Sequence, residues 1–360
     1  CLGNIRLQRL PPYKGDVMKQ KNRELKVIFW LIVILFAGFL ALPILILLGK
    51  SIWDGKPTAE FFASVVTQSG FMPALGNSFK IASLAAALAT AVAFGMAYAV
   101  HYTALPKWIK KIITAIATLP MYLPTITYGF AIIYSFGKQG LITRVFGRQL
   151  FDIYGIISLL VGYVIYTVPV AFLLINNTMG FVDKKTLVVS KVMGDRAMST
   201  FWIAVLRPLL GTMAGAFVQA FFLCFTDFGI PASVGGGYDV IATTLYNQML
   251  GGIPDFNRGA VIAMIMLIPS IGSICILRIL ERFNIRYNRI ERAELHKSAV
   301  RDLSWGMTDA VVSVAILSVF AVIFLVPCVE AWPYKTGFTL THFRAVFADR
   351  QLTAVYTHSI

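Results

Sequence analysis

Residues 187–208, LVVSKVMGDRAMSTFWIAVLRP, lie between two long apolar runs and decide how the rest of the chain is interpreted. The stretch is too polar to cross a bilayer and too apolar for a loop that only connects two spans. Leu187, Val188, Val192 and Met193 fall near i, i+1, i+5 and i+6, which predicts a short helix with one apolar stripe. We therefore expect a short helix on the cytoplasmic face of a membrane bundle, with one side packed down and the other presented for docking.

The composition indicates a membrane protein that crosses the bilayer several times. Hydrophobic residues make up 58% of the chain and charged residues 14%, with a mean hydropathy of +0.74. An ordinary soluble domain is nearer ~45–50% apolar and about 25% charged. The net charge of +15 is interpreted as membrane topology, so no nucleic-acid partner is expected. The cysteines show no spacing typical of a disulfide or a metal site: Cys1, Cys224, Cys275 and Cys328.

The chain contains seven apolar runs, and the length of each is close to that of a helix crossing the hydrocarbon core, about 20 residues. A basic tail, residues 1–26, precedes the first run, which predicts a retained span and a cytoplasmic N-terminus. With alternating spans, most of the 32 Lys and Arg residues then fall on the cytoplasmic side, as the positive-inside rule requires. The predicted spans are residues 27–48, 77–101, 112–137, 155–176, 209–228, 260–280 and 310–326.

An internal repeat predicts the domain organisation. The pairs Leu42-Pro43, Glu60-Phe61 and Asn77-Ser78 are echoed by Val326-Pro327, His342-Phe343 and His358-Ser359 at an offset of about 280 residues. We expect residues 27–280 to form a first six-span repeat with a cytoplasmic loop at 179–208. A charged cytoplasmic linker, residues 281–309, then leads to the start of a truncated second repeat at 310–360. The chain is expected to be a fragment at both ends.

The sequence contains no catalytic constellation. The four histidines are scattered, and no phosphate-binding glycine loop or metalloprotease motif occurs, so energy must come from another subunit or from a gradient. Asp227 is followed by Gly229 and Pro231, which interrupt a helix, and it is a candidate for the outer mouth of a translocation path; a local cap is the alternative. The other candidate path residues are Tyr128, Tyr163 and Gln219, for which helix packing is the alternative.

Several motifs together resemble one family. Val188-Val189-Ser190 is followed by Gly194, by Phe201-Trp202 and by Pro208, and residues 227–236 read DFGIPASVGG. With the prolines at 120 and 124, this pattern resembles the permease subunits of type I ABC importers, in particular the fused ferric-iron and 2-aminoethylphosphonate permeases. The family's docking loop reads Glu-Ala-Ala, three residues and Gly. Val188 stands in the position of the glutamate.

The resemblance implies an all-α type I permease bundle in a bacterial inner membrane. It implies a docking loop for an ABC ATP-binding subunit, which would hold the ATP while this chain binds no cofactor itself. An extracytoplasmic solute-binding protein would be the other partner. Because the glutamate is missing, either this is the degenerate copy of a fused permease, or coupling rests on shape and on the charged pair at 195 and 196. The docking residues implied are Val188, Ser190, Lys191, Gly194, Asp195, Arg196, Phe201 and Pro208.

The helix at 187–208 has an alternative role: a basic helix could lie on anionic lipid in place of docking to a protein. Two other classes of function for the whole chain also remain open. A secondary transporter also uses repeats and broken helices, but it places ion-coupling acids near the middle of the membrane, where the predicted spans have almost none. A membrane scaffold or sensor would use the loops as partner sites. A bound ATPase subunit would separate the importer from both.

Overall fold

The computed structural model describes residues 15–53, 56–183, 185–281 and 298–359, and these residues are mainly helical. Within them, six helices are long and apolar enough to cross a membrane, and one sharply bent pair of helices makes a possible seventh span. All seven follow the predicted spans in order. The prediction of an all-α polytopic membrane fold is confirmed.

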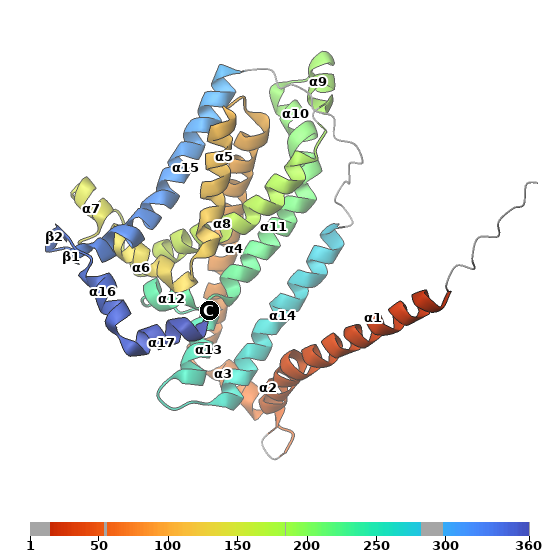
Figure 1. Ribbon diagram of the computed structural model, residues 1–360, viewed down its shortest axis with the longest axis vertical. Coiled ribbons are helices and arrows are strands. Elements are labelled where there is room, and N and C mark those ends of the chain that lie inside the picture. Colours follow the sequence, from red (N-terminus) through yellow and green to blue (C-terminus); the bar gives the residue numbers. More distant parts are fainter. Residues whose placement is uncertain (1–14, 54–55, 184, 282–297, 360) are drawn as a thin grey trace, which may run out of the picture.

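The first span stands apart from the bundle. It consists of α1 (Gly15–Phe36), the π-helical turn η1 (Ala37–Ala41) and α2 (Leu42–Ile52), followed by the short α3 (Glu60–Thr67). Its apolar window is wholly exposed, and α2 meets α14 (Phe256–Glu281) at the end of the span (Figure 1). An apolar helix without protein neighbours is stable only in lipid or against another membrane helix.

Three long helices form the core. They are α4 (Phe71–Tyr102), α8 (Ile156–Gly180) and α11 (Arg207–Thr226), and α4 packs along both of the others. The seam on α4 is built from fully buried small residues, which let helix backbones approach closely in a membrane: Ala82, Ala85, Ala86, Ala89 and Ala93.

The third span, predicted at residues 112–137, is broken into two helices. The chain forms α5 (Lys107–Thr118), the 3₁₀ turn η2 (Leu119–Tyr122) and α6 (Thr125–Phe136), with a bend of 110° between the two arms. Proline cannot donate a backbone hydrogen bond and clashes with the preceding turn. Pro120 and Pro124 bracket the bend, so the proline pair ends one helix and starts another.

Short helices cover the outer end of the bundle. These are α7 (Leu141–Phe146), α12 (Gly229–Val234) and α13 (Ile241–Leu250). Ser78 of α4 accepts a hydrogen bond from the Ile241 N–H at 2.7 Å, and Asn77 donates to the Asp239 carbonyl at 3.1 Å. The outer loop after α12 is therefore held on the first core helix.

The last long helix, α15 (Ala299–Leu325), begins about three turns before the predicted span at 310–326. The predicted linker at 281–309 is therefore wrong at its C-terminal end, and its residues 282–297 lie outside the described residues. Asp309 is consequently inside the helix and only 3% exposed. The sequence argument that the spans lack buried acids fails for this helix.

After α15 the chain forms η4 (Val326–Cys328), an antiparallel pair of β1 (Val329–Ala331) with β2 (Lys335–Phe338), then α16 (Thr341–Ala348) and α17 (Arg350–Ser359). The helices α3 and α16 each have 8 residues and stand at matching positions of the predicted repeat. The division into two repeats stays a prediction.

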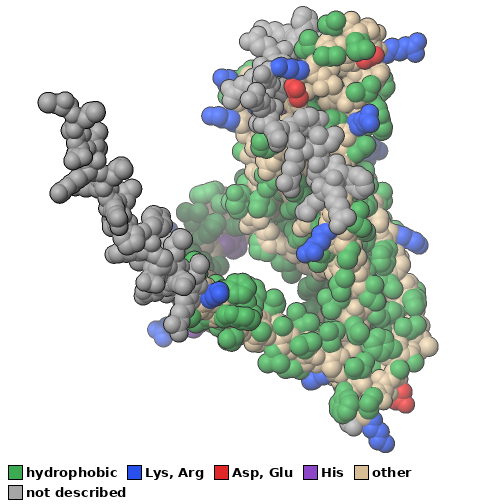
Figure 2. All heavy atoms as spheres, turned by 90° about the vertical axis from the view of Figure 1, so that its right-hand side faces the viewer, with side chains coloured by type: hydrophobic (Ala, Val, Ile, Leu, Met, Phe, Trp, Pro, Cys, Tyr) green, Lys and Arg blue, Asp and Glu red, His purple; other side chains and the backbone are tan. Residues whose placement is uncertain are grey.

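The surface carries a charge pattern suited to a bilayer. Figure 2 shows Lys and Arg side chains around the end of the molecule that carries α9 and α10, with hydrophobic side chains covering most of this face below it and further charges at the opposite tip. Exposed large hydrophobic residues occur on every one of the long helices. The predicted topology puts this end in the cytoplasm, where the basic residues of membrane proteins concentrate.

Candidate functional site

The predicted docking segment is a short helix followed by a tight turn. α9 (Lys185–Val192) leads to Gly194, whose φ of 76° lies in the left-handed region that glycine adopts without strain. α10 (Ala197–Phe201), the π-helical turn η3 (Trp202–Leu206) and α11 then form one helix of 30 residues. The sequence placed residues 197–208 in the loop, whereas they are the first turns of the fifth span.

A small buried polar cluster fixes the shape of the turn. The Ser190 hydroxyl donates to an Asp195 carboxylate oxygen at 2.5 Å and shares a 2.8 Å hydrogen bond with the Thr200 hydroxyl. Ser190 is 4% exposed and Thr200 8%. Ser190 and Asp195, both predicted to dock, therefore act within the segment. The sequence analysis did not identify Thr200 as a member of this cluster. The one sequence signal for it was a polar residue in the otherwise apolar first turns of the helix.

The apolar stripe of the segment faces outward. Val188 is 52% exposed, Val192 83% and Met193 76%, and the neighbouring Met198 of α10 is also exposed. The buried side of the helix is the one that carries Ser190. A solvent-facing apolar edge on a rigid turn is the kind of surface that another protein covers.

The remaining predicted docking residues occupy different environments. Gly194 and Arg196 are exposed beside the stripe, and the Lys191 side chain lies outside the described residues. Phe201 packs inward, with its ring 6.1 Å from that of Phe94 and 5.9 Å from that of Tyr98. Pro208 is half-buried within the long helix. Phe201 and Pro208 therefore help to anchor the segment, and their contact with a partner stays a prediction.

Two interrupted helices cross at the predicted translocation path. Asp227 ends α11, is 8% exposed, and accepts the Ile230 N–H of α12 at 3.0 Å. No space remains for a Cβ at Gly229, which lies against Thr125, or at Gly129, which lies against Ser233. The N-terminal turns of α6 and α12 are thus in close contact, a crossing we call the α6–α12 crossing.

Three of the four predicted path residues gather around this crossing. Tyr128 donates a hydrogen bond to the Pro120 carbonyl, and its ring lies 6.0 Å from that of Tyr166. Tyr163 is 1% exposed and lies within electrostatic reach of Asp227 and Tyr166. Gln219 is half-buried eight residues before Asp227, roughly 12 Å along the helix, and does not join them. The cluster is packed, so this conformation is closed at the crossing.

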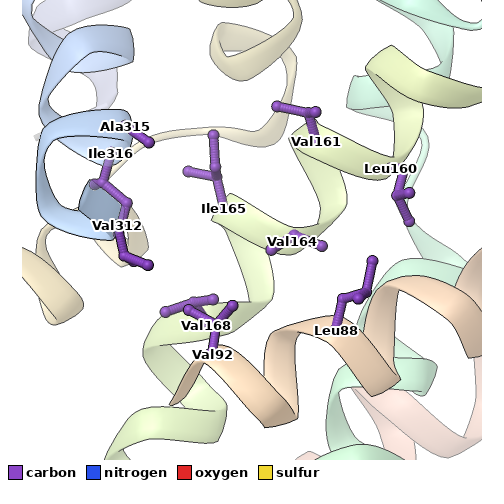
Figure 3. Close-up of a pocket in the computed structure, with 10 residues that line it drawn as sticks. All are labelled: Leu88, Val92, Leu160, Val161, Val164, Ile165, Val168, Val312, Ala315 and Ile316. Carbon is purple, nitrogen blue, oxygen red and sulfur yellow. The ribbon is translucent and has the colours of Figure 1, made fainter. Parts of the chain in front are cut away.

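Two cavities flank the core. One of about 340 Å³ lies between α4, α8 and α15, and only aliphatic side chains line it, among them Leu88, Val164 and Ile316 (Figure 3). Because such walls cannot solvate a charge, this cavity is no route for a charged solute.

The second cavity, of about 430 Å³, lies at the outer end between α12 and α13 and has polar groups from Tyr154, Asp239 and Asn247. Tyr238 donates from its hydroxyl to the Asn77 carbonyl at 3.4 Å. Burial raises the pKa of the Tyr238 phenol above its ordinary value, so this group stays a neutral hydrogen-bond donor. The cavity is therefore a polar recess on the outer side of the α6–α12 crossing. Among the described residues, no group of three or more His, Cys, Asp and Glu side chains could hold a metal ion.

Comparison with known proteins identifies relatives across most of this region. The family model "Binding-protein-dependent transport system inner membrane component" matches residues 89–286. A putative ferric transport system permease protein of Haemophilus influenzae is 22% identical over 248 residues, 67% of this chain and 39% of that protein. A ferric transport system permease protein of Actinobacillus pleuropneumoniae is 23% identical over 158 residues, 42% of this chain and 23% of that protein. The chain thus spans less than half the length of these relatives.

The fold is also similar to solved structures. One is a bacterial ABC transporter involved in the import of the acidic polysaccharide alginate, with a TM-score of 0.61 and 12% identity over 73% of this chain and 96% of that chain. The other is the alginate ABC transporter in complex with its pentasaccharide-bound periplasmic protein, with a TM-score of 0.58 and 13% identity over 78% and 100%. At this identity the likeness concerns the fold alone.

Proposed function

The chain belongs to the family of binding-protein-dependent transport system inner membrane components, and we propose that it forms half of the translocation path of an ATP-driven importer. In this proposal the ATP is bound and hydrolysed on a separate subunit, and the solute arrives from an extracytoplasmic binding protein. The chain is a multi-pass inner-membrane permease component, with its N-terminus in the cytoplasm. It supplies no catalytic site and holds no cofactor.

One observation carries the proposal. The docking segment presents Val188, Val192 and Met193 on a turn fixed by Ser190, and the same turn opens the 30-residue helix Ala197–Thr226 that ends at the α6–α12 crossing. A subunit that moves this turn therefore moves a helix that reaches the predicted path. A helix lying loosely on lipid would not need this rigid connection.

Ferric iron is the solute we propose. Two relatives are named as ferric transport permeases, and they match 67% and 42% of the chain. The solute is cargo here and needs no resident metal site in this chain. Neither of these two relatives is named for 2-aminoethylphosphonate, the other solute suggested by the sequence motifs. That compound serves as the comparison solute in the test.

The test is co-purification of the ATPase subunit with the full-length permease, as wild type and as Val188→Asp. We expect the charge to weaken ATPase binding at least about tenfold, because it is placed in an apolar contact. Val145→Asp is the matched control, since Val145 is 77% exposed on α7 at the outer end. If the wild type recovers no ATPase subunit, a secondary transporter or scaffold is the better account.

The solute is tested in the same preparation. The binding protein loaded with ferric iron is expected to stimulate ATP hydrolysis, and the binding protein offered 2-aminoethylphosphonate is not. The reverse result would replace ferric iron by the phosphonate while leaving the importer intact.

A further inference from the structure

Trp305 joins α15 to the cytoplasmic half of α4. Its ring centroid lies 4.7 Å from that of Tyr98 at an angle of 43°. Gly95 leaves the space for it, because a Cβ at that position would lie 3.2 Å from Trp305 Cζ3. Tyr98 in turn stacks on Tyr102 at 5.2 Å. The indole is therefore wedged in a notch on α4 that a larger residue than glycine would narrow.

The same Tyr98 ring touches the docking segment. The ring of Phe201, the last residue of α10, lies 5.9 Å from that of Tyr98 at an angle of 64°. Tyr98 is only 8% exposed, and close-packed interiors give a ring in such a place little room to absorb a displacement. A shift of Phe201 is therefore passed on through Tyr98 to Trp305.

Polar contacts hold the first turn of α15 to the turn between α4 and α5. Asp302 accepts the Ala104 N–H at 3.2 Å and the Ser298 N–H at 3.3 Å. It also accepts the Arg301 guanidinium at 2.8 Å. The start of α15 is thus anchored beside the docking segment, at the level of Trp305.

Further along, the middle of α15 faces a cavity. The aliphatic cavity of about 340 Å³ separates Val312 and Ile316 of α15 from Leu88 of α4 and from the facing side of α8 (Figure 3). With no polar pair across the gap, no directional contact fixes the distance between the helices there. Beyond the cavity α15 packs again, where Val319 is 1% and Phe320 4% exposed, so the middle of the helix is the part that can shift with little steric cost.

We infer that Trp305 is a positioning residue that passes the motion of the docking segment to α15, whose middle shifts into the aliphatic cavity. The motion passes from Phe201 to Tyr98, then to Trp305 and finally to α15. The inference rests on the proposed docking of an ATPase subunit. It adds a route by which that subunit acts on the first helix after the linker, separate from the route along α11.

The test uses the full-length permease with its ATPase subunit, reconstituted in lipid nanodiscs with the native cysteines replaced by serine. Nitroxide labels are placed at Ile157→Cys on α8 and Val311→Cys on α15, both more than half exposed. The distance between the labels is measured without nucleotide and with ATP plus vanadate, so no solute is needed. We expect the wild type to change by at least about 2 Å.

The expected result separates Trp305 from a merely structural residue. Trp305→Ala abolishes the distance change, whereas the affinity for the ATPase subunit stays within about twofold, because Trp305 is not on the exposed stripe. Trp305→Phe keeps the change, since a ring still fills the notch at Gly95. Ala315→Phe abolishes it with the indole intact, because the new ring occupies the cavity that Ala315 lines.

A full distance change in Trp305→Ala overturns the inference. A wild type that binds the ATPase subunit but shows no nucleotide-dependent change overturns it as well, since α15 then does not move. If no ATPase subunit binds the wild type, the proposed function itself is wrong, and the inference falls with it.

Discussion

Replacing Ser190 by alanine tests whether the buried polar cluster fixes the docking segment. The substitution removes the hydrogen bonds to Asp195 at 2.5 Å and to Thr200 at 2.8 Å. Because Asp195 is exposed, solvent screens the Ser190–Asp195 hydrogen bond, and we assign its loss a cost of under about 1 kcal/mol. The buried Thr200 hydroxyl loses its partner, which costs about 1–2 kcal/mol more. The sum is about 2 kcal/mol, equivalent to roughly 30-fold in an opening equilibrium.

The assay is amide hydrogen exchange of the purified permease, read on peptides that cover residues 185–201. Exchange through local opening is expected to become roughly 30-fold faster in Ser190→Ala within this segment and to stay unchanged in α4 and α8. Ser199→Ala is the matched control, because Ser199 is the neighbouring half-buried serine and its side chain has no hydrogen bond in the described structure. Equal exchange in Ser190→Ala and Ser199→Ala would refute the reasoning, since the turn would then be held by its backbone alone.

Two further substitutions test the packing of the spans. Gly229→Ala is expected to lower the melting temperature of the detergent-solubilised permease by several degrees, because the methyl group would overlap Thr125 at the α6–α12 crossing. Gly70→Ala is the control and is expected to melt close to wild type, because the space around Gly70 is open. Asp309→Leu is expected to raise the melting temperature, because one oxygen of the buried Asp309 carboxylate has no hydrogen-bond partner among the described residues. A lowered melting temperature in Asp309→Leu would instead indicate a polar partner for that oxygen outside them.

Hydropathy was sufficient for the order of the spans but not for their ends. The predicted seventh span began at 310 because Arg301, Asp302 and Asp309 precede it. In the structure Asp302 accepts two backbone N–H groups and the Arg301 side chain, so the charged first turns are satisfied as helix. A window average registers those charges as the end of a span, because it carries no information about their partners.

The docking segment shows a different limit. Its helix and its glycine turn were predicted from local sequence, since apolar spacing and the left-handed preference of glycine are local properties. Which side is buried was not predictable, because Ser190 finds Thr200 ten residues later and Phe201 finds Tyr98 on α4. The sequence also carried no sign that Asp195 and Phe201 have partners within the fold, and their predicted contact with an ATPase subunit stays a prediction.

The long helix from Ala197 to Thr226 connects the two predicted sites directly. At 1.5 Å per residue its 30 residues span roughly 45 Å, from the docking segment to Asp227. A tilt of about 5° around its middle would displace each end by roughly 2 Å, in opposite directions. At the outer end, the Asp227 carboxylate holds Ile230, and Gly229 has no free space against Thr125. Such a displacement cannot be absorbed within the α6–α12 crossing, so it must separate the two helices there, which is the motion that an outward-facing path needs.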